Sequence, residues 1–202
     1  MNGKTHTAVG IATGLALASV LPTVTGANYT DLTFSLGASV IGALFPDLDI
    51  NQSKGNQVLN KVLAYGIPAM LLYYCFARRG FNGILNSSVE EIVAIIVFLG
   101  IGVWCRTRPH REASHSLLMC SITTLAVYTF TGGYLFVYYA AGFLSHLAID
   151  LLNTKGESLL WPSPGKYCFS LCKAGGVGDK AIGYAAGVLS VLLLLGGATA
   201  WF

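Results

Sequence analysis

The stretch Ser116–Ile149 reads SLLMCSITTLAVYTFTGGYLFVYYAAGFLSHLAI and contains no acidic or basic residue apart from His146. A membrane-spanning helix needs about 20 mostly apolar residues, so this stretch is too long for one span. Thr131-Gly132-Gly133, near its middle, is typical of a break between helices. We therefore predict two hydrophobic helices joined by a short turn.

Mostly apolar stretches continue on both sides of this pair. In all, the sequence predicts seven hydrophobic helices, over Thr7–Tyr29, Leu32–Pro46, Val58–Ala77, Val89–Cys105, the two halves of Ser116–Ile149, and Ala181–Phe202. The second helix is short, so it either spans the membrane or re-enters from the same side. Its small residues Gly37, Ala38, Ser39, Gly42 and Ala43 suit close helix packing.

Composition supports a membrane protein. Of the 202 residues, 54% are hydrophobic and 10% are charged, whereas soluble domains carry about 25% charged residues. The mean hydropathy is +0.63. A net charge of +3 without a long basic run argues against a nucleic-acid partner, and the odd count of five cysteines argues against a disulfide framework. We predict an all-α, polytopic transmembrane helix bundle that forms a single integral membrane domain over residues 1–202.

The positions of lysine and arginine predict an orientation. With seven spans, the N-terminus and the loops 47–57, 106–115 and 153–180 share one side, which carries ten of these residues. The opposite side carries only Arg78 and Arg79. The positive-inside rule therefore places the N-terminal side in the cytoplasm, and a re-entrant second helix would invert the later spans.

The histidines and most of the aspartates gather in a few motifs at helix ends on this predicted cytoplasmic side. The candidate metal ligands are His6, Asp47, Asp49, His110, His115, His146 and Asp150. Ionisable residues at membrane depth are costly and usually functional. Each of these residues also has a structural explanation as a polar helix end or a hydrogen-bonded pair, so the prediction depends on the whole set.

The spacing within each motif suits a shared ion. His146 and Asp150 are four apart and share one helix face. Asp47 and Asp49 would point the same way in an extended segment after Pro46. Pro109 indicates a loop that would let His110 fold back towards His115, with Ser114 as the N-cap of the next helix. Imidazole and carboxylate ligands suit zinc, manganese or iron.

These motifs resemble those of the YdjM-like family of bacterial inner-membrane proteins, which are described as metal-dependent hydrolases. The resemblance rests on Thr5-His6, Leu44–Asp49, His110–Leu118, Gly142–Asp150 and Leu159–Pro162, in that order. It departs at Ile50, where relatives often have histidine, and at Glu112, where they often have glycine. The family is distantly similar to zinc-dependent phospholipases C and P1-type nucleases, which implies phosphoester hydrolysis, a lipid or lipid-linked substrate and location in the bacterial inner membrane.

The resulting hypothesis is a hydrolase that uses one or more divalent metals, zinc or else manganese. Asp49 or Glu112 would act as the general base on a metal-bound water. Arg111, Lys155 or Lys166 would bind a phosphate headgroup, although ordinary positive-inside charge also explains them. Residues 153–180 would cap the site, with Trp161 and Tyr167 at the lipid interface.

Three other functions fit the same residues. A seven-span zinc amidase acting on a lipid amide would use Ser114 or Ser145 beside the histidines. A metal or proton transporter would spread its ionisable groups through the membrane depth. A structural metal staple would close the coordination shell and leave no position for water. Clustering at helix ends favours the hydrolase over the transporter.

Overall fold

The computed structural model describes residues 1–21, 29–49, 86–133 and 135–201. The predicted helix Val58–Ala77 and the residues Cys75, Arg78 and Arg79 lie outside these ranges.

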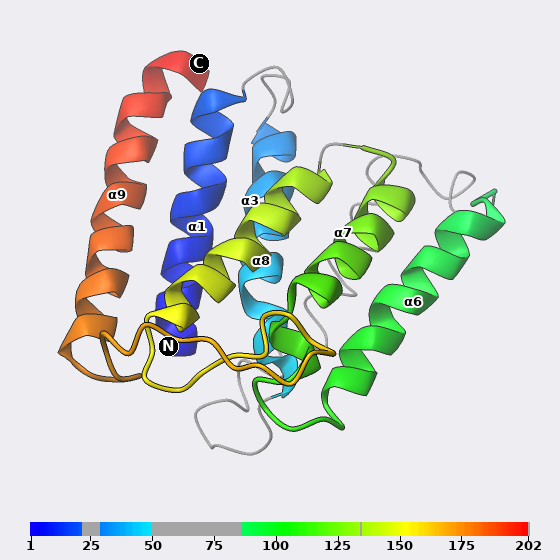
Figure 1. Cartoon of the computed structure of the whole chain (residues 1–202). Helices are drawn as coiled ribbons and strands as arrows, with labels where there is room; N and C mark the ends of the chain where they lie inside the picture. The colour runs from blue at the N-terminus through cyan, green and yellow to red at the C-terminus, as the bar shows by residue number, and fades with distance from the viewer. Residues whose placement is uncertain (22–28, 50–85, 134, 202) are drawn as a thin grey trace.

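The described chain is helical (Figure 1). Its α-helices are α1 (Gly3–Val20), α3 (Tyr29–Leu44), α6 (Val89–Cys105), α7 (Leu117–Thr131), α8 (Leu135–Leu151) and α9 (Val177–Trp201), with short 3₁₀ helices η1 (Pro46–Asp49) and η3 (Ala113–His115). Outside them, the described residues form two isolated β-bridges and no longer strand. The all-α prediction is confirmed.

Local sequence explains where the helices begin and end. α6 has the predicted bounds, and Ser88 and Glu91 form a capping box at its start. The predicted break after Thr131 is also confirmed, because Gly132 ends α7 with φ 65°, a left-handed conformation that glycine adopts without strain. The predicted cap of α7 was wrong: Ser116, not Ser114, accepts the hydrogen bond from the backbone N–H of Met119, at 3.2 Å.

The seven predicted spans are not established. By length and composition, one described helix can cross a membrane, through its segment Val177–Gly196 in α9. Three shorter apolar segments lie at Leu32–Leu44, Leu117–Thr131 and Leu135–Leu151. The helices other than α9 have between 15 and 18 residues, somewhat below the length of about 20 that a simple span requires.

Small residues bring α3 and α8 into close contact, as the prediction for the second helix required. A Cβ atom added to Gly42 would lie 2.1 Å from the carbonyl oxygen of Tyr139, and one added to Gly142 would lie 1.9 Å from that of Ser39. α3 also packs on α1, where Ser39 donates a hydrogen bond to the carbonyl of Gly10 at 2.8 Å. Glycine at positions 42 and 142 therefore allows the short distance between α3 and α8.

All elements that carry the candidate ligands meet at one end of the bundle. α1 and α7 begin there, whereas α3 and α8 end there (Figure 1). The segment that follows α8, residues 152–176, runs beneath this end before α9 begins; we call it the α8–α9 loop. The fold thus gathers residues far apart in the sequence around one buried space.

Candidate metal centre

His146 has the tautomer and direction of a metal ligand. It is fully buried on α8, and its Nδ1 lies 2.7 Å from the backbone carbonyl of Ala43. A carbonyl oxygen can only accept, so Nδ1 carries the proton and Nε2 keeps its lone pair. Nε2 makes no hydrogen bond within the described residues and lies 3.9 Å from Oδ1 of Asp47. Two electron-rich atoms that face one another in this way fit a cation between them.

His6, from the first turn of α1, lies against His146. The two imidazole rings stack with centroids 3.7 Å apart and planes 13° apart. Nε2 of His6 is 3.2 Å from Oδ1 of Asp150 and 3.9 Å from Oδ2 of Asp47. His6 is therefore within reach of both carboxylates, and all of these side chains are buried.

His115 approaches the same space from η3. Its Nε2 is 3.8 Å from Oδ1 of Asp47, and its ring centroid is 5.0 Å from that of His146. Its Nδ1 is 2.8 Å from the hydroxyl of Ser114, which can fix the imidazole as the carbonyl of Ala43 does for His146. The exposed ring of His110 packs edge-on at 5.1 Å from that of His115, so the predicted fold-back occurs.

Asp47 is the carboxylate that all three buried imidazoles share. It lies in η1, a helical turn, so the predicted extended segment was wrong. Burial alone would raise the pKa of Asp47, but His146, His115 and His6 together hold it below the ordinary value. The carboxyl group is therefore ionised, as a metal ligand must be.

Asp150 joins the site to two basic groups. It lies one turn after His146 on α8, as the spacing predicts, and is buried. The guanidinium of Arg111 donates a hydrogen bond to its Oδ2 at 2.6 Å, and the N-terminal ammonium of Met1 contacts Oδ1. Arg111 also donates to the carbonyl of Lys155 at 2.5 Å. Its φ of 67°, uncommon for a residue with a side chain, directs it inwards.

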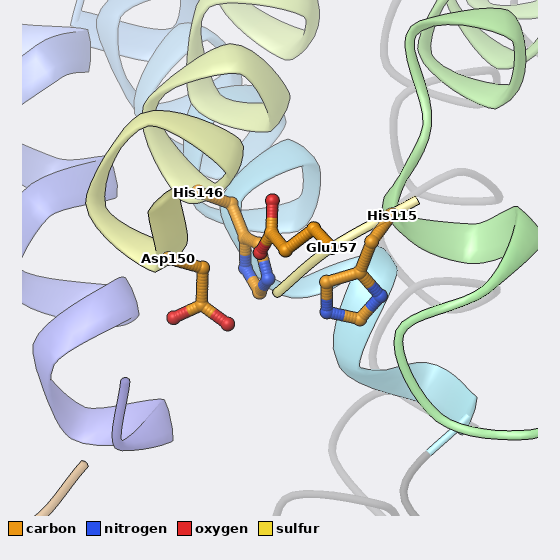
Figure 2. A group of neighbouring side chains, drawn as sticks. All are labelled: His115, His146, Asp150 and Glu157. Atoms are coloured by element: carbon orange, nitrogen blue, oxygen red, sulfur yellow. The ribbon is translucent and has the colours of Figure 1, made fainter. Parts of the chain in front are cut away.

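Glu157 is a site residue that the sequence reading did not find. It belongs to the α8–α9 loop, is fully buried, and lies with His115, His146 and Asp150 (Figure 2). Neither carboxylate oxygen accepts a hydrogen bond within the described residues. Burial raises the pKa of the Glu157 carboxyl to about 8, and the nearby charge of Asp150 adds to the rise. A cation beside the carboxylate would offset both effects.

The donor set fits a divalent metal. Ligand atoms within 4.8 Å of one another form three overlapping groups, namely His115, His146, Asp150 and Glu157; His6, Asp47 and His146; and Asp47, His110 and His115. Bonds of about 2.0–2.2 Å to a tetrahedral zinc ion place two ligand atoms about 3.3–3.6 Å apart. The observed N···O separations of 3.8–3.9 Å at Asp47 exceed this range by only a few tenths of an ångström. The residues can therefore hold a metal ion without large rearrangement.

The other predicted site residues lie in different environments. The side chain of Asp49 is outside the described residues. Glu112 is half-buried at the start of η3 and belongs to none of the three groups. Lys155 and Lys166 are exposed, whereas Arg111 is buried and engaged by Asp150, an environment unlike that of a headgroup-binding side chain at the surface.

Comparison with known proteins gives the family. The chain belongs to the YdjM inner membrane protein family, whose model matches residues 1–201. It is therefore a membrane protein. Searches of curated proteins and of solved structures found no match.

Proposed function

We propose that this protein is a membrane-embedded, metal-dependent hydrolase that cleaves a phosphoester in a lipid or lipid-linked substrate. The observation that carries the proposal is the buried set of imidazole and carboxylate groups around Asp47, with Nε2 of His146 directed at Oδ1 across 3.9 Å. Such a set has a high desolvation cost unless a cation balances it. Membership in an inner-membrane family makes a lipid the natural substrate.

Zinc is the metal we favour, with manganese as the alternative. Mixed imidazole and carboxylate ligands suit both ions. The ligands are His6, Asp47, His110, His115, His146, Asp150 and Glu157, with Asp49 as a further candidate. A tetrahedral ion takes four ligands, so there are more candidate ligands than one such ion needs. The set can hold one ion that uses some of these residues, or two neighbouring ions.

The protein's own groups supply orientation and proton transfer. A bound divalent metal lowers the pKa of its water to about 7 and polarises the scissile phosphoryl oxygen. Glu112, half-buried beside η3, would accept the proton of that water, as would Asp49. Arg111 holds Asp150 and the backbone of the α8–α9 loop in place, so we assign it to positioning. Exposed Lys155 and Lys166 remain the candidates for headgroup binding.

The lysines also support a topology. The ligand end of the bundle carries the α8–α9 loop, in which Lys155, Lys166 and Lys173 are exposed. The positive-inside rule therefore favours a multi-pass protein in the bacterial inner membrane with the metal centre at the cytoplasmic face.

A lipid amidase is the second candidate, because of Ser114. Its hydroxyl is buried and lies 2.8 Å from Nδ1 of the candidate ligand His115, so a serine is part of the metal centre. Ser145 is less suited, since its hydroxyl donates to the carbonyl of Gly142 on its own helix. Transport is disfavoured, because the candidate ligands gather at one end of the bundle instead of following a path through it.

Metal analysis and a substrate panel test the proposal. Protein purified in detergent, after reconstitution with zinc or manganese, should contain stoichiometric metal by mass spectrometry. The metal-loaded protein should then release product from phosphoester lipids and not from matched N-acyl amides. Release from the amides alone would favour the amidase. Absence of metal even after reconstitution would exclude both enzymes.

A further inference from the structure

The α8–α9 loop has a fixed backbone although it lacks regular secondary structure. The N–H of Phe169 donates to the carbonyl of Leu151 at 2.6 Å, and that of Leu171 donates to the carbonyl of Leu152 at 2.9 Å. Glu157 and Tyr167 exchange both of their backbone hydrogen bonds, at 3.0 and 2.9 Å. These bonds attach residues 167–171 to the end of α8 and to Glu157, whose side chain points into the metal centre.

This fixed backbone displays large apolar side chains on the outside of the protein. Phe169 is 66% exposed and Leu171 is 74% exposed, and Tyr167 is 41% exposed. Val177, at the start of α9, is 87% exposed. In water, holding these side chains outward would cost the hydrophobic free energy that burial provides, so the pattern points to an apolar partner.

The exposed charge on the same segment has one sign. Between residues 152 and 180 the chain carries Lys155, Lys166, Lys173 and Lys180, together with two acidic residues, Glu157 and Asp179. All four lysines are exposed. The two acids are buried, at 0% and 1% exposure. The carboxylate of Asp179 accepts backbone hydrogen bonds from Gly175 and Asn2.

The position along the chain identifies the partner. The segment Val177–Gly196, long and apolar enough to cross a membrane, begins six residues after Leu171. The exposed apolar side chains of the loop therefore lie close to the membrane–water interface. Aromatic and aliphatic side chains beside lysines are the combination that binds the boundary between acyl chains and anionic headgroups.

We propose that the outer face of the α8–α9 loop, formed by Tyr167, Phe169, Leu171, Lys166 and Lys173, is a binding surface for anionic phospholipid. The apolar side chains enter the outer part of the acyl region, and the lysines contact the phosphate groups. The same loop carries Glu157, whose side chain points into the metal centre. Contact with lipid therefore places this loop, which covers the metal centre, at the membrane surface.

Fluorescence quenching by brominated lipid tests this surface without reference to metal or catalysis. The variant Phe169→Trp is placed in nanodiscs of phosphatidylcholine mixed with either brominated phosphatidylcholine or brominated phosphatidylglycerol, with the wild type as the reference for the native tryptophans. We expect brominated lipid to quench the added tryptophan and aqueous acrylamide to leave it largely protected. Quenching by brominated phosphatidylglycerol should be about twofold stronger, because each lysine near the surface enriches anionic lipid.

A charge variant supplies the matched control. In Phe169→Trp combined with Lys166→Gln and Lys173→Gln, the preference for brominated phosphatidylglycerol should disappear while quenching by brominated phosphatidylcholine persists. Equal quenching by both lipids when the lysines are present would overturn the anionic selectivity. Full access to acrylamide without quenching by either lipid would overturn the surface itself. Neither result bears on metal content, so failure of this surface would leave the proposed metal centre unaffected.

Discussion

Replacing His146 by alanine should separate metal binding from folding. The imidazole is fully buried, and its Nε2 has no hydrogen-bond partner within the described residues, so its lone pair is available to a metal ion. A structural zinc site contributes about 10–16 kcal/mol, so one of four ligands contributes about 2.5–4 kcal/mol. We therefore expect His146→Ala to weaken metal binding by roughly 10²–10³-fold.

Thermal unfolding in detergent gives the readout. With metal at a hundred times the wild-type Kd, binding should stabilise the wild type by about 2.7 kcal/mol, which raises the Tm of a domain of this size by about 5–10 °C. At the same concentration His146→Ala should gain less than about 0.4 kcal/mol, or roughly 1 °C. Mass spectrometry of metal content should show the corresponding loss.

Phe130→Ala is the matched control. Phe130 is buried on α7 and packs against Phe98, with ring centroids 5.7 Å apart, and it belongs to none of the ligand groups. Its removal should lower stability by about 3–5 kcal/mol and yet preserve the metal-induced rise in Tm. If His146→Ala kept the same rise as Phe130→Ala, the assignment of His146 as a ligand would be refuted.

Further predictions concern other parts of the site and the fold. Glu157→Gln should weaken metal binding by about 10–100-fold without unfolding the protein, as metal titration would show. Glu112→Gln should retain metal but lower kcat by about 10²–10⁴-fold on a cleaved phosphoester lipid, whereas unchanged kcat would assign the base elsewhere. Bound metal, followed by mass spectrometry after dialysis at decreasing pH, should be lost on acidification, because protonated imidazoles cannot ligate. Gly142→Ala should lower stability by about 1–3 kcal/mol or more, since its Cβ would lie 1.9 Å from the carbonyl of Ser39, while Gly100→Ala, with nothing within 4 Å, should not lower it.

The sequence predicted those features that depend on local pattern. The bounds of α6 follow from a capping box before an apolar run, and the break after Thr131 follows from a glycine pair. Each of His6, His115 and His146 lies near an end of an apolar segment, and the structure brings these ends together at one end of the bundle. Such signals need only neighbouring residues.

Features that depend on tertiary contacts could not be predicted from the sequence. Glu157 lies in a loop without periodicity, and its one sequence signal is that it is the single acidic residue between Asp150 and Asp179. Arg111 looked like a surface cation, but a left-handed backbone conformation turns it towards Asp150. The burial of Asp179 requires the backbone of Asn2, which is 177 residues away. None of these contacts leaves a pattern along the chain.

The metal centre and the close packing of the helices depend on the same contact. Gly42 and Gly142 allow α3 and α8 to touch along their backbones. This contact brings the carbonyl of Ala43 to 2.7 Å from Nδ1 of His146 and so fixes the tautomer that presents Nε2 to Asp47. A side chain at Gly142 would separate the helices and release that imidazole. Loss of packing should therefore weaken metal binding as well as stability, although Gly142 is not a ligand and lies one helical turn before His146.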